Sequence, residues 1–183
     1  TYVIIPAGST KVDFTVTTIV DNTYEGSETV VATISNATTN GTESLVITTP
    51  SATGTIVDND DTLDSDKPTV SISVDPAVVA EGDNAGDEAT MTYKVELTNP
   101  SATATKVYVD LSGQATENAD YTVSGLSSDA NGTYVIIPAG QTSVDFKVTT
   151  IVDNTYEGRE SVIATISNAT TTTTAGTESL GNL

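Results

Sequence analysis

The sequence of 183 residues contains no cysteine, no histidine and no tryptophan. Disulfides, zinc sites built from cysteine or histidine, and catalysis by either side chain are therefore excluded. Only 6 lysines and arginines accompany 25 aspartates and glutamates, which gives a formal net charge of −19. Because so acidic a surface repels nucleic acid and anionic lipid, we expect neither as a partner, whereas cations are attracted. No apolar run approaches the roughly 18 residues of a membrane span, so we expect no membrane insertion in this segment.

Short segments of alternating polarity fill the chain instead of long apolar runs. In "KVDFTVTTIV" (11–20), Val12, Phe14 and Val16 would share one face of a strand. The same period of two recurs in the segments 28–36, 69–76, 89–100, 105–113 and 133–140. Threonine occurs 36 times, and its β-branched polar side chain suits the wet face of a strand. The sequence predicts an all-β protein with the architecture of an antiparallel β-sandwich.

An internal repeat organises the chain. Residues 1–39 align with 133–171 without a gap, and 33 of the 39 positions are identical. The offset of 132 suits tandem whole domains. We therefore predict the C-terminal part of one repeat at 1–61, an acidic linker at 62–67, and a second repeat at 68–183 that lacks its last strand. Either these 183 residues are part of a longer repetitive chain, or neighbouring molecules exchange strands to complete their units.

The differences between the two copies support this assignment of strands. Within 11–20 and 28–36 every changed position is odd, whereas the apolar positions Val12, Phe14 and Val30 are unchanged. A half-buried strand is expected to vary on its solvent-facing side because the volume of a core is constrained.

Acidic residues gather at predicted strand ends. The octapeptide "IVDNTYEG" occurs at 19–26 and again at 151–158. Calcium takes six to eight oxygen ligands, so several loops at one end of a sandwich would have to contribute to one site. In the first unit the candidate ligands are Asp21, Glu25, Glu28, Asp58, Asp60 and Asp61, and in the second they are Glu81, Asp120, Asp153, Glu157 and Glu160. The alternative is that these residues are solvated turn formers, because aspartate side chains bond readily to nearby backbone.

Four motifs carry a family resemblance. They are "AEGD" (80–83), "ADYT" (119–122), "DNTYEGRE" (153–160) and "GTIVDND" (54–60). Together they resemble the Calx-beta domain, which occurs in sodium/calcium exchangers, integrin β4 and many bacterial surface proteins. The resemblance implies an immunoglobulin-like sandwich of two sheets with Ca²⁺ at one end, held by the candidate acids above. Each unit here contains only part of that ligand set.

The expected function follows from the repeat and its acids. We expect a calcium-binding structural repeat of an extracellular or cell-surface adhesin, stalk or fibre, of bacterial origin, in which calcium stiffens loops and interdomain joints. Its partners would be neighbouring repeats of the same chain, and other copies if a filament forms. The alternatives are a self-assembling filament subunit and a regulatory calcium sensor. We expect no enzyme, because the acids lie in polar loops and aromatic residues make up only 5% of the chain.

Overall fold

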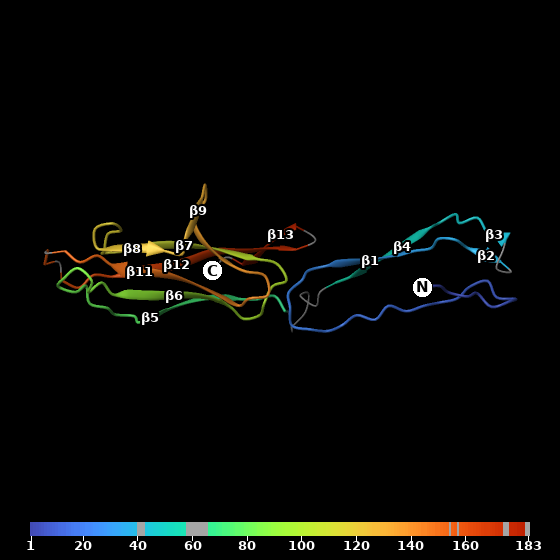
Figure 1. The fold of residues 1–183 in the computed structure, drawn as a ribbon, viewed down its shortest axis with the longest axis horizontal. Coiled ribbons are helices and arrows are strands. Elements are labelled where there is room, and N and C mark those ends of the chain that lie inside the picture. Colours follow the sequence, from blue (N-terminus) through green and yellow to red (C-terminus); the bar gives the residue numbers. More distant parts are fainter. Residues whose placement is uncertain (40–42, 58–65, 154, 157, 174–175, 182–183) are drawn as a thin grey trace.

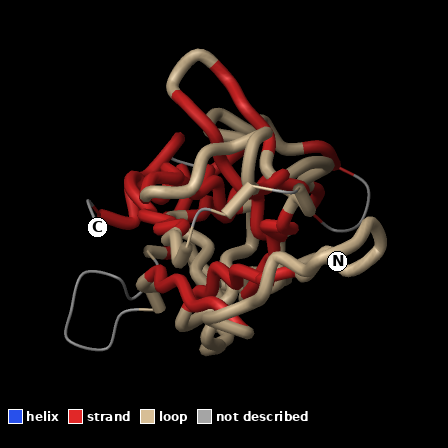
Figure 2. The backbone as a smooth tube through the Cα atoms, turned by 90° about the vertical axis from the view of Figure 1, so that its left-hand side faces the viewer, coloured by secondary structure: helices blue, strands red, loops and turns tan. Residues whose placement is uncertain are grey.

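The computed structural model describes residues 1–39, 43–57, 66–153, 155–156, 158–173 and 176–181. These residues form thirteen strands and no helix (Figure 2). Figure 1 shows two lobes placed end to end along the longest axis, with the first unit in one lobe and the second unit in the other. The prediction of an all-β fold is confirmed.

The second unit is a sandwich of two antiparallel sheets. The four-stranded sheet has the order β5 (Val70–Asp75), β6 (Thr90–Leu97), β11 (Ser143–Thr150) and β8 (Tyr121–Ser124). The five-stranded sheet has the order β13 (Gly176–Gly181), β12 (Val162–Thr173), β7 (Thr105–Gly113), β10 (Gly132–Ile137) and β9 (Ser127–Asp129). The order in each sheet brings together strands that lie far apart in the sequence, so this unit depends on long-range pairing.

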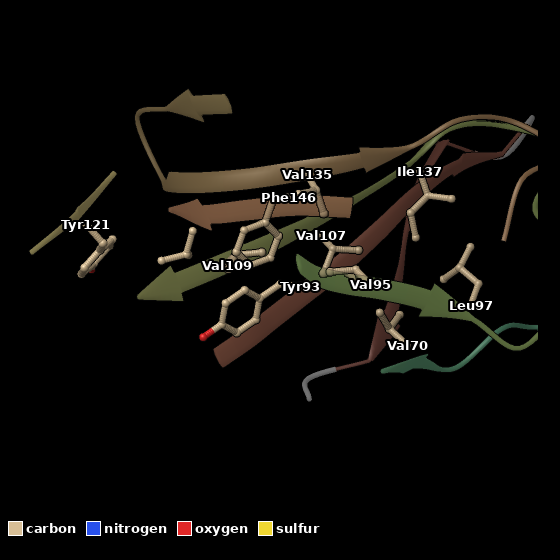
Figure 3. Packing of buried hydrophobic residues seen from close by; sticks show 12 residues of the cluster. Val70, Tyr93, Val95, Leu97, Val107, Val109, Tyr121, Val135, Ile137 and Phe146 are labelled. Atoms are coloured by element: carbon tan, nitrogen blue, oxygen red, sulfur yellow. The ribbon is translucent and has the colours of Figure 1, made fainter. Parts of the chain in front are cut away.

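The core between these sheets follows the predicted alternation. Tyr93 from β6 and Phe146 from β11 stack with their ring centroids 4.9 Å apart and their planes 8° apart (Figure 3). The other buried apolar residues are Val70, Val95, Leu97, Val107, Val109, Tyr121, Val135, Ile137, Val148 and Ala169. The positions that differ between the copies avoid this core, since Lys147 and Ile163 are exposed. The predicted separation of a constrained face from a variable face is confirmed in this unit.

The first unit is built on a long hairpin. β1 (Glu28–Thr33) pairs with β4 (Ser51–Ile56), and β2 (Thr38–Thr39) pairs with β3 (Glu43–Ser44). The tip repeats a pairing of the second unit, because Thr38 lies opposite Ser44 as Thr170 lies opposite Ser179. β3 therefore corresponds to part of β13, and β4, which follows β3 in the chain, continues the hairpin along β1.

The predicted strand with a buried face at 11–20 is wrong for this chain. Residues 11–20 form no strand, and Phe14 is 62% exposed, whereas its counterpart Phe146 is 1% exposed. The reason lies in the partners, since β11 pairs with β6 on one side and β8 on the other. At an offset of 132, the counterparts of β6 and β8 would precede residue 1. The period of two is present at 11–20, but no described strand takes the place of these partners.

Candidate metal site

The repeated octapeptide has the same local structure in both units. The Asp153 Oδ1 atom accepts a hydrogen bond of 2.6 Å from the Thr155 N–H, and Asp21 Oδ1 accepts one of 2.8 Å from Thr23. The glycine that closes the octapeptide has a positive φ in both units, +74° at position 26 and +85° at 158, which favours glycine. The Asx turn therefore uses one carboxylate oxygen of each aspartate.

In the second unit, the loop containing Glu81 lies against the octapeptide. The Asp153 N–H donates to Glu81 Oε1 at 3.4 Å, and the Thr150 hydroxyl donates to the Glu81 carbonyl at 3.5 Å. The next residue, Gly82, has a φ of +92°, and a Cβ atom there would lie 2.6 Å from the Asp87 Cβ. A glycine is therefore required for the turn that presents Glu81.

Asp120 joins the same end of the sandwich from the turn before β8. Its carboxylate accepts a hydrogen bond of 2.6 Å from the Thr116 N–H. Its carbonyl accepts one of 2.8 Å from the N–H of Ile151, the first residue of the octapeptide. The backbone thereby fixes the turn containing Asp120 to the start of the octapeptide loop.

Glu160 brings a third carboxylate to this end. The pKa of Glu160 is raised, first by loss of solvation, then by the charge of Asp120 and a hydrogen bond to it, and last by the charge of Glu81. All three residues line a cavity of about 690 Å³. We call Glu81, Asp120 and Glu160 the acidic cluster, and the end of the sandwich that carries it the acidic end. Mutual repulsion in the acidic cluster is a physical cost that a bound cation would reduce.

The chemistry of these ligands suits calcium, although the described residues do not form a closed cage. Every candidate offers carboxylate oxygens, which hard cations prefer. Within the described ranges, no group of three or more acidic residues is arranged to hold a metal ion. Glu157, one of the predicted ligands, lies outside the described residues. The ligand set of the second unit therefore stays a prediction, for which the acidic cluster and Asp153 provide neighbouring donors.

The first unit brings fewer of its predicted ligands together. Asp21, Glu25 and Glu28 are exposed. Glu28 begins β1 opposite Ile56, the last residue of β4. The predicted ligands Asp58, Asp60 and Asp61 follow β4 in the sequence but lie outside the described residues. At the offset of the repeat, counterparts of Glu81 and Asp120 would precede residue 1, so the described residues of this unit form no equivalent of the acidic cluster.

Sequence reasoning missed Arg159, which also lines the cavity of the acidic cluster. Ser27 stands at the corresponding position of the first unit. The exchange is one of the six differences between the copies, but it lies outside the two segments, 11–20 and 28–36, in which the pattern of differences was used. Arg159 places a fixed positive charge in the wall of the same cavity, so it would oppose a cation there.

One of the comparisons with known proteins agrees with the motifs. The described part of the chain contains no helix that could span a membrane. Searches of curated proteins and of solved structures found no match. The sequence model of the Calx-beta domain matches residues 3–60 and 64–181, which together make up most of the chain. The chain therefore belongs to the Calx-beta domain family and contains tandem units of it.

Proposed function

We propose that the chain is a calcium-binding structural repeat of an extracellular adhesin, stalk or fibre. The observation that carries this proposal is the convergence of Glu81, Asp120 and Glu160 at one end of a sandwich from a family associated with calcium binding. Loss of solvation, and then the charges of Asp120 and Glu81, raise the pKa of Glu160, so a divalent cation bound near these carboxylates would replace repulsion with attraction.

The arrangement of the units favours a spacer over an isolated sensor. The two lobes lie end to end (Figure 1), and 33 of 39 aligned positions are identical between the copies. Near-identical units in series extend a chain, whereas a sensor requires only one responsive domain. An extracellular setting supplies the calcium that such loops need, since extracellular modules bind with dissociation constants of about 10⁻⁴–10⁻³ M.

The residues of the second unit have distinct roles in this proposal. Calcium, when bound, supplies positive charge at the acidic end. The hydrogen bond from Ile151 to Asp120 holds the start of the octapeptide against the neighbouring turn, and the bond from Asp153 to Glu81 holds its middle. These bonds orient the loops toward one another, so ligation would stiffen loops that already touch.

Thermal melting of the 183-residue chain with calcium or with a chelator tests this function. We expect calcium to raise the Tm, because a ligand at about 100 times its Kd adds about 2.7 kcal/mol. Asp120→Asn should reduce the rise, whereas the control Asp110→Asn, which changes an exposed acid on β7, should preserve it. A Tm that does not respond to calcium, or an equal response in the two variants, would refute the proposal.

Strand exchange in a filament is a second candidate, favoured by one observation about the hairpins. In the first unit β4 pairs along β1, but in the second unit the matching part of β12 pairs with β7, and no described strand lies on its other edge. That edge has the backbone pattern to accept a β4-like strand from another molecule. Sedimentation over a range of concentrations tests this: growing oligomers support exchange, and a monomer throughout eliminates it.

A further inference from the structure

One tyrosine occupies two opposite environments in this chain. Tyr24 and Tyr156 stand at the same place in the identical octapeptides. Tyr24 is 1% exposed, whereas Tyr156 is 98% exposed. Since the local sequence is the same, the difference comes from what each loop meets.

Tyr24 meets a loop of the second unit. The Tyr24 N–H donates to the Pro100 carbonyl at 3.0 Å, and the Ala102 N–H donates to the Tyr24 carbonyl at 2.9 Å. These two bonds form a parallel β-bridge between Tyr24 and Ser101. The contact therefore combines directional backbone bonds with burial of a large aromatic side chain, as at well-packed interfaces.

The receiving loop at 98–103 is itself fixed to the second sandwich. Ser101 is buried, its carbonyl accepts a hydrogen bond of 2.8 Å from the Gly140 N–H, and its hydroxyl lies 2.9 Å from that of Thr171. The Asn99 side chain also donates to the Asp66 carbonyl at 3.2 Å, which ties the end of the linker to the same loop. We call residues 98–103 the docking loop.

The octapeptide and the docking loop lie at opposite ends of the second sandwich. The octapeptide follows β11, and its first residue bonds to Asp120 at the acidic end. The docking loop follows β6, and the neighbouring Leu97 N–H bonds to the Thr142 carbonyl just before β11 begins. The second unit thus has the octapeptide tyrosine at one end, and at the other end it has the loop that binds the equivalent tyrosine of the preceding unit.

We propose that the octapeptide tyrosine is an interdomain plug, and that Tyr156 presents the same plug to the docking loop of a further Calx-beta unit of this repeat type. The partner is specified by the contact already present between Tyr24 and the second unit. The plug uses backbone hydrogen bonds and aromatic burial, so it holds without calcium. Its success or failure is therefore separate from that of the proposed calcium function.

Nitration of tyrosines in the 183-residue chain, with chelator present, tests the existing plug. Lys147 and Arg159 bracket Tyr156, so trypsin separates it from Tyr24 for mass spectrometry. We expect Tyr24 to react at least on the order of tenfold more slowly than Tyr156, because its ring is accessible only when the joint opens. Equal rates for these two tyrosines would overturn the proposal.

A lengthened chain tests whether a further unit buries Tyr156. Residues 1–180 joined to residues 46–183 continue the repeat in phase, because Leu180 corresponds to Leu45. Arg159→Lys in the appended copy distinguishes its tryptic peptide by mass. We expect Tyr156 of the first copy to become protected on the order of tenfold, while the marked Tyr156 keeps its fast reaction. Fast nitration of both would overturn the assignment of a further unit as the partner.

Discussion

The two copies of the repeated segment share their local structure but differ in their burial. Asp21 and Asp153 form the same turn, and Asn36 and Asn168 both adopt a positive φ, at 56° and 47°. The tip of the hairpin has the same register in both units. Yet Phe14 is 62% exposed where Phe146 is 1% exposed. Turns and registers therefore follow from neighbouring residues, whereas burial requires the partner strands β6 and β8.

At the octapeptide tyrosine the difference in burial between the two units is reversed. The first unit, which leaves Phe14 exposed, buries Tyr24, and the second, which buries Phe146, exposes Tyr156. A segment that pairs with no described strand of its own unit is thus held at its end by the next unit. The phenylalanine is buried by a contact within a unit, whereas the tyrosine is buried by a contact between units.

Replacement of the equivalent phenylalanines is expected to give the largest difference in stability between the two copies. Phe146→Ala removes the ring that stacks on Tyr93 and leaves a cavity, so we expect a loss of about 3–5 kcal/mol in the free energy of unfolding. Phe14→Ala changes an exposed side chain, so we expect a loss below about 0.5 kcal/mol. Urea unfolding followed by circular dichroism measures both, and similar losses would show that the first copy has a core of its own.

The equivalent glutamates at positions 28 and 160 give a smaller, pH-dependent effect. Because the folded-state pKa of Glu160 is raised, its contribution to stability is fully present below the ordinary glutamate pKa of about 4.3 and is lost as the pH rises through the raised value. Glu160→Gln keeps the side chain neutral. We therefore expect the variant to have a higher Tm than the parent chain at pH 7 without calcium, and no advantage at pH 3.5.

Glu28→Gln is the matched control for this effect. The counterparts of Asp120 and Glu81 would precede residue 1, so we expect no change in Tm at pH 7 from the replacement of Glu28. A Tm gain common to both variants would mean that net charge, rather than the acidic cluster, is responsible. Calcium should stabilise the Glu160→Gln chain less than the parent chain, which links the same carboxylate to metal binding.

Arg159 should have the smallest effect. Arg159→Ser installs the residue of the first copy and removes a positive charge from the wall of the cavity. We expect calcium affinity, measured by calorimetry, to rise roughly two- to fivefold, because Arg159 is exposed and exposed charges interact weakly. Lys147→Thr, another exchange between the copies, removes an exposed charge from β11 and should leave the affinity unchanged. If both variants bind more tightly, the effect is one of overall charge.

The fold of the second unit was predictable because apolar and polar residues alternate along its strands. Val95, Leu97 and Val148 are buried as the alternation requires, and the exchanged position 147 is exposed. The resemblance to the Calx-beta family implied that Glu81, Asp120 and Glu160 lie at one end of the sandwich, and the three residues line one cavity there, although their ligation of a metal stays a prediction. These successes rest on patterns that short segments carry by themselves.

The rest depends on contacts between distant segments. Alternation at 11–20 predicted a buried strand, but a pattern within one segment cannot show whether partner strands lie on both sides of it, and no described strand pairs with 11–20. Tyr24 and Tyr156 are indistinguishable in sequence, so no local pattern could assign one to a joint and the other to solvent. Arg159 could not be placed in the same cavity as Asp120 from the sequence, because their relative positions depend on how the strands are arranged.

The hairpin register has a consequence for how such repeats vary in length. Three extra residues lie between Thr170 and Ser179 compared with Thr38 and Ser44, yet the flanking pairs are the same. Insertions beyond the Thr171–Glu178 pair therefore leave the pairing of Thr170 with Ser179 unchanged, and they leave in place Thr171, whose hydroxyl lies 2.9 Å from that of Ser101 in the docking loop. The hairpin tip is thus a permissive position, where an epitope or a reporter peptide can be grafted without rephasing the array.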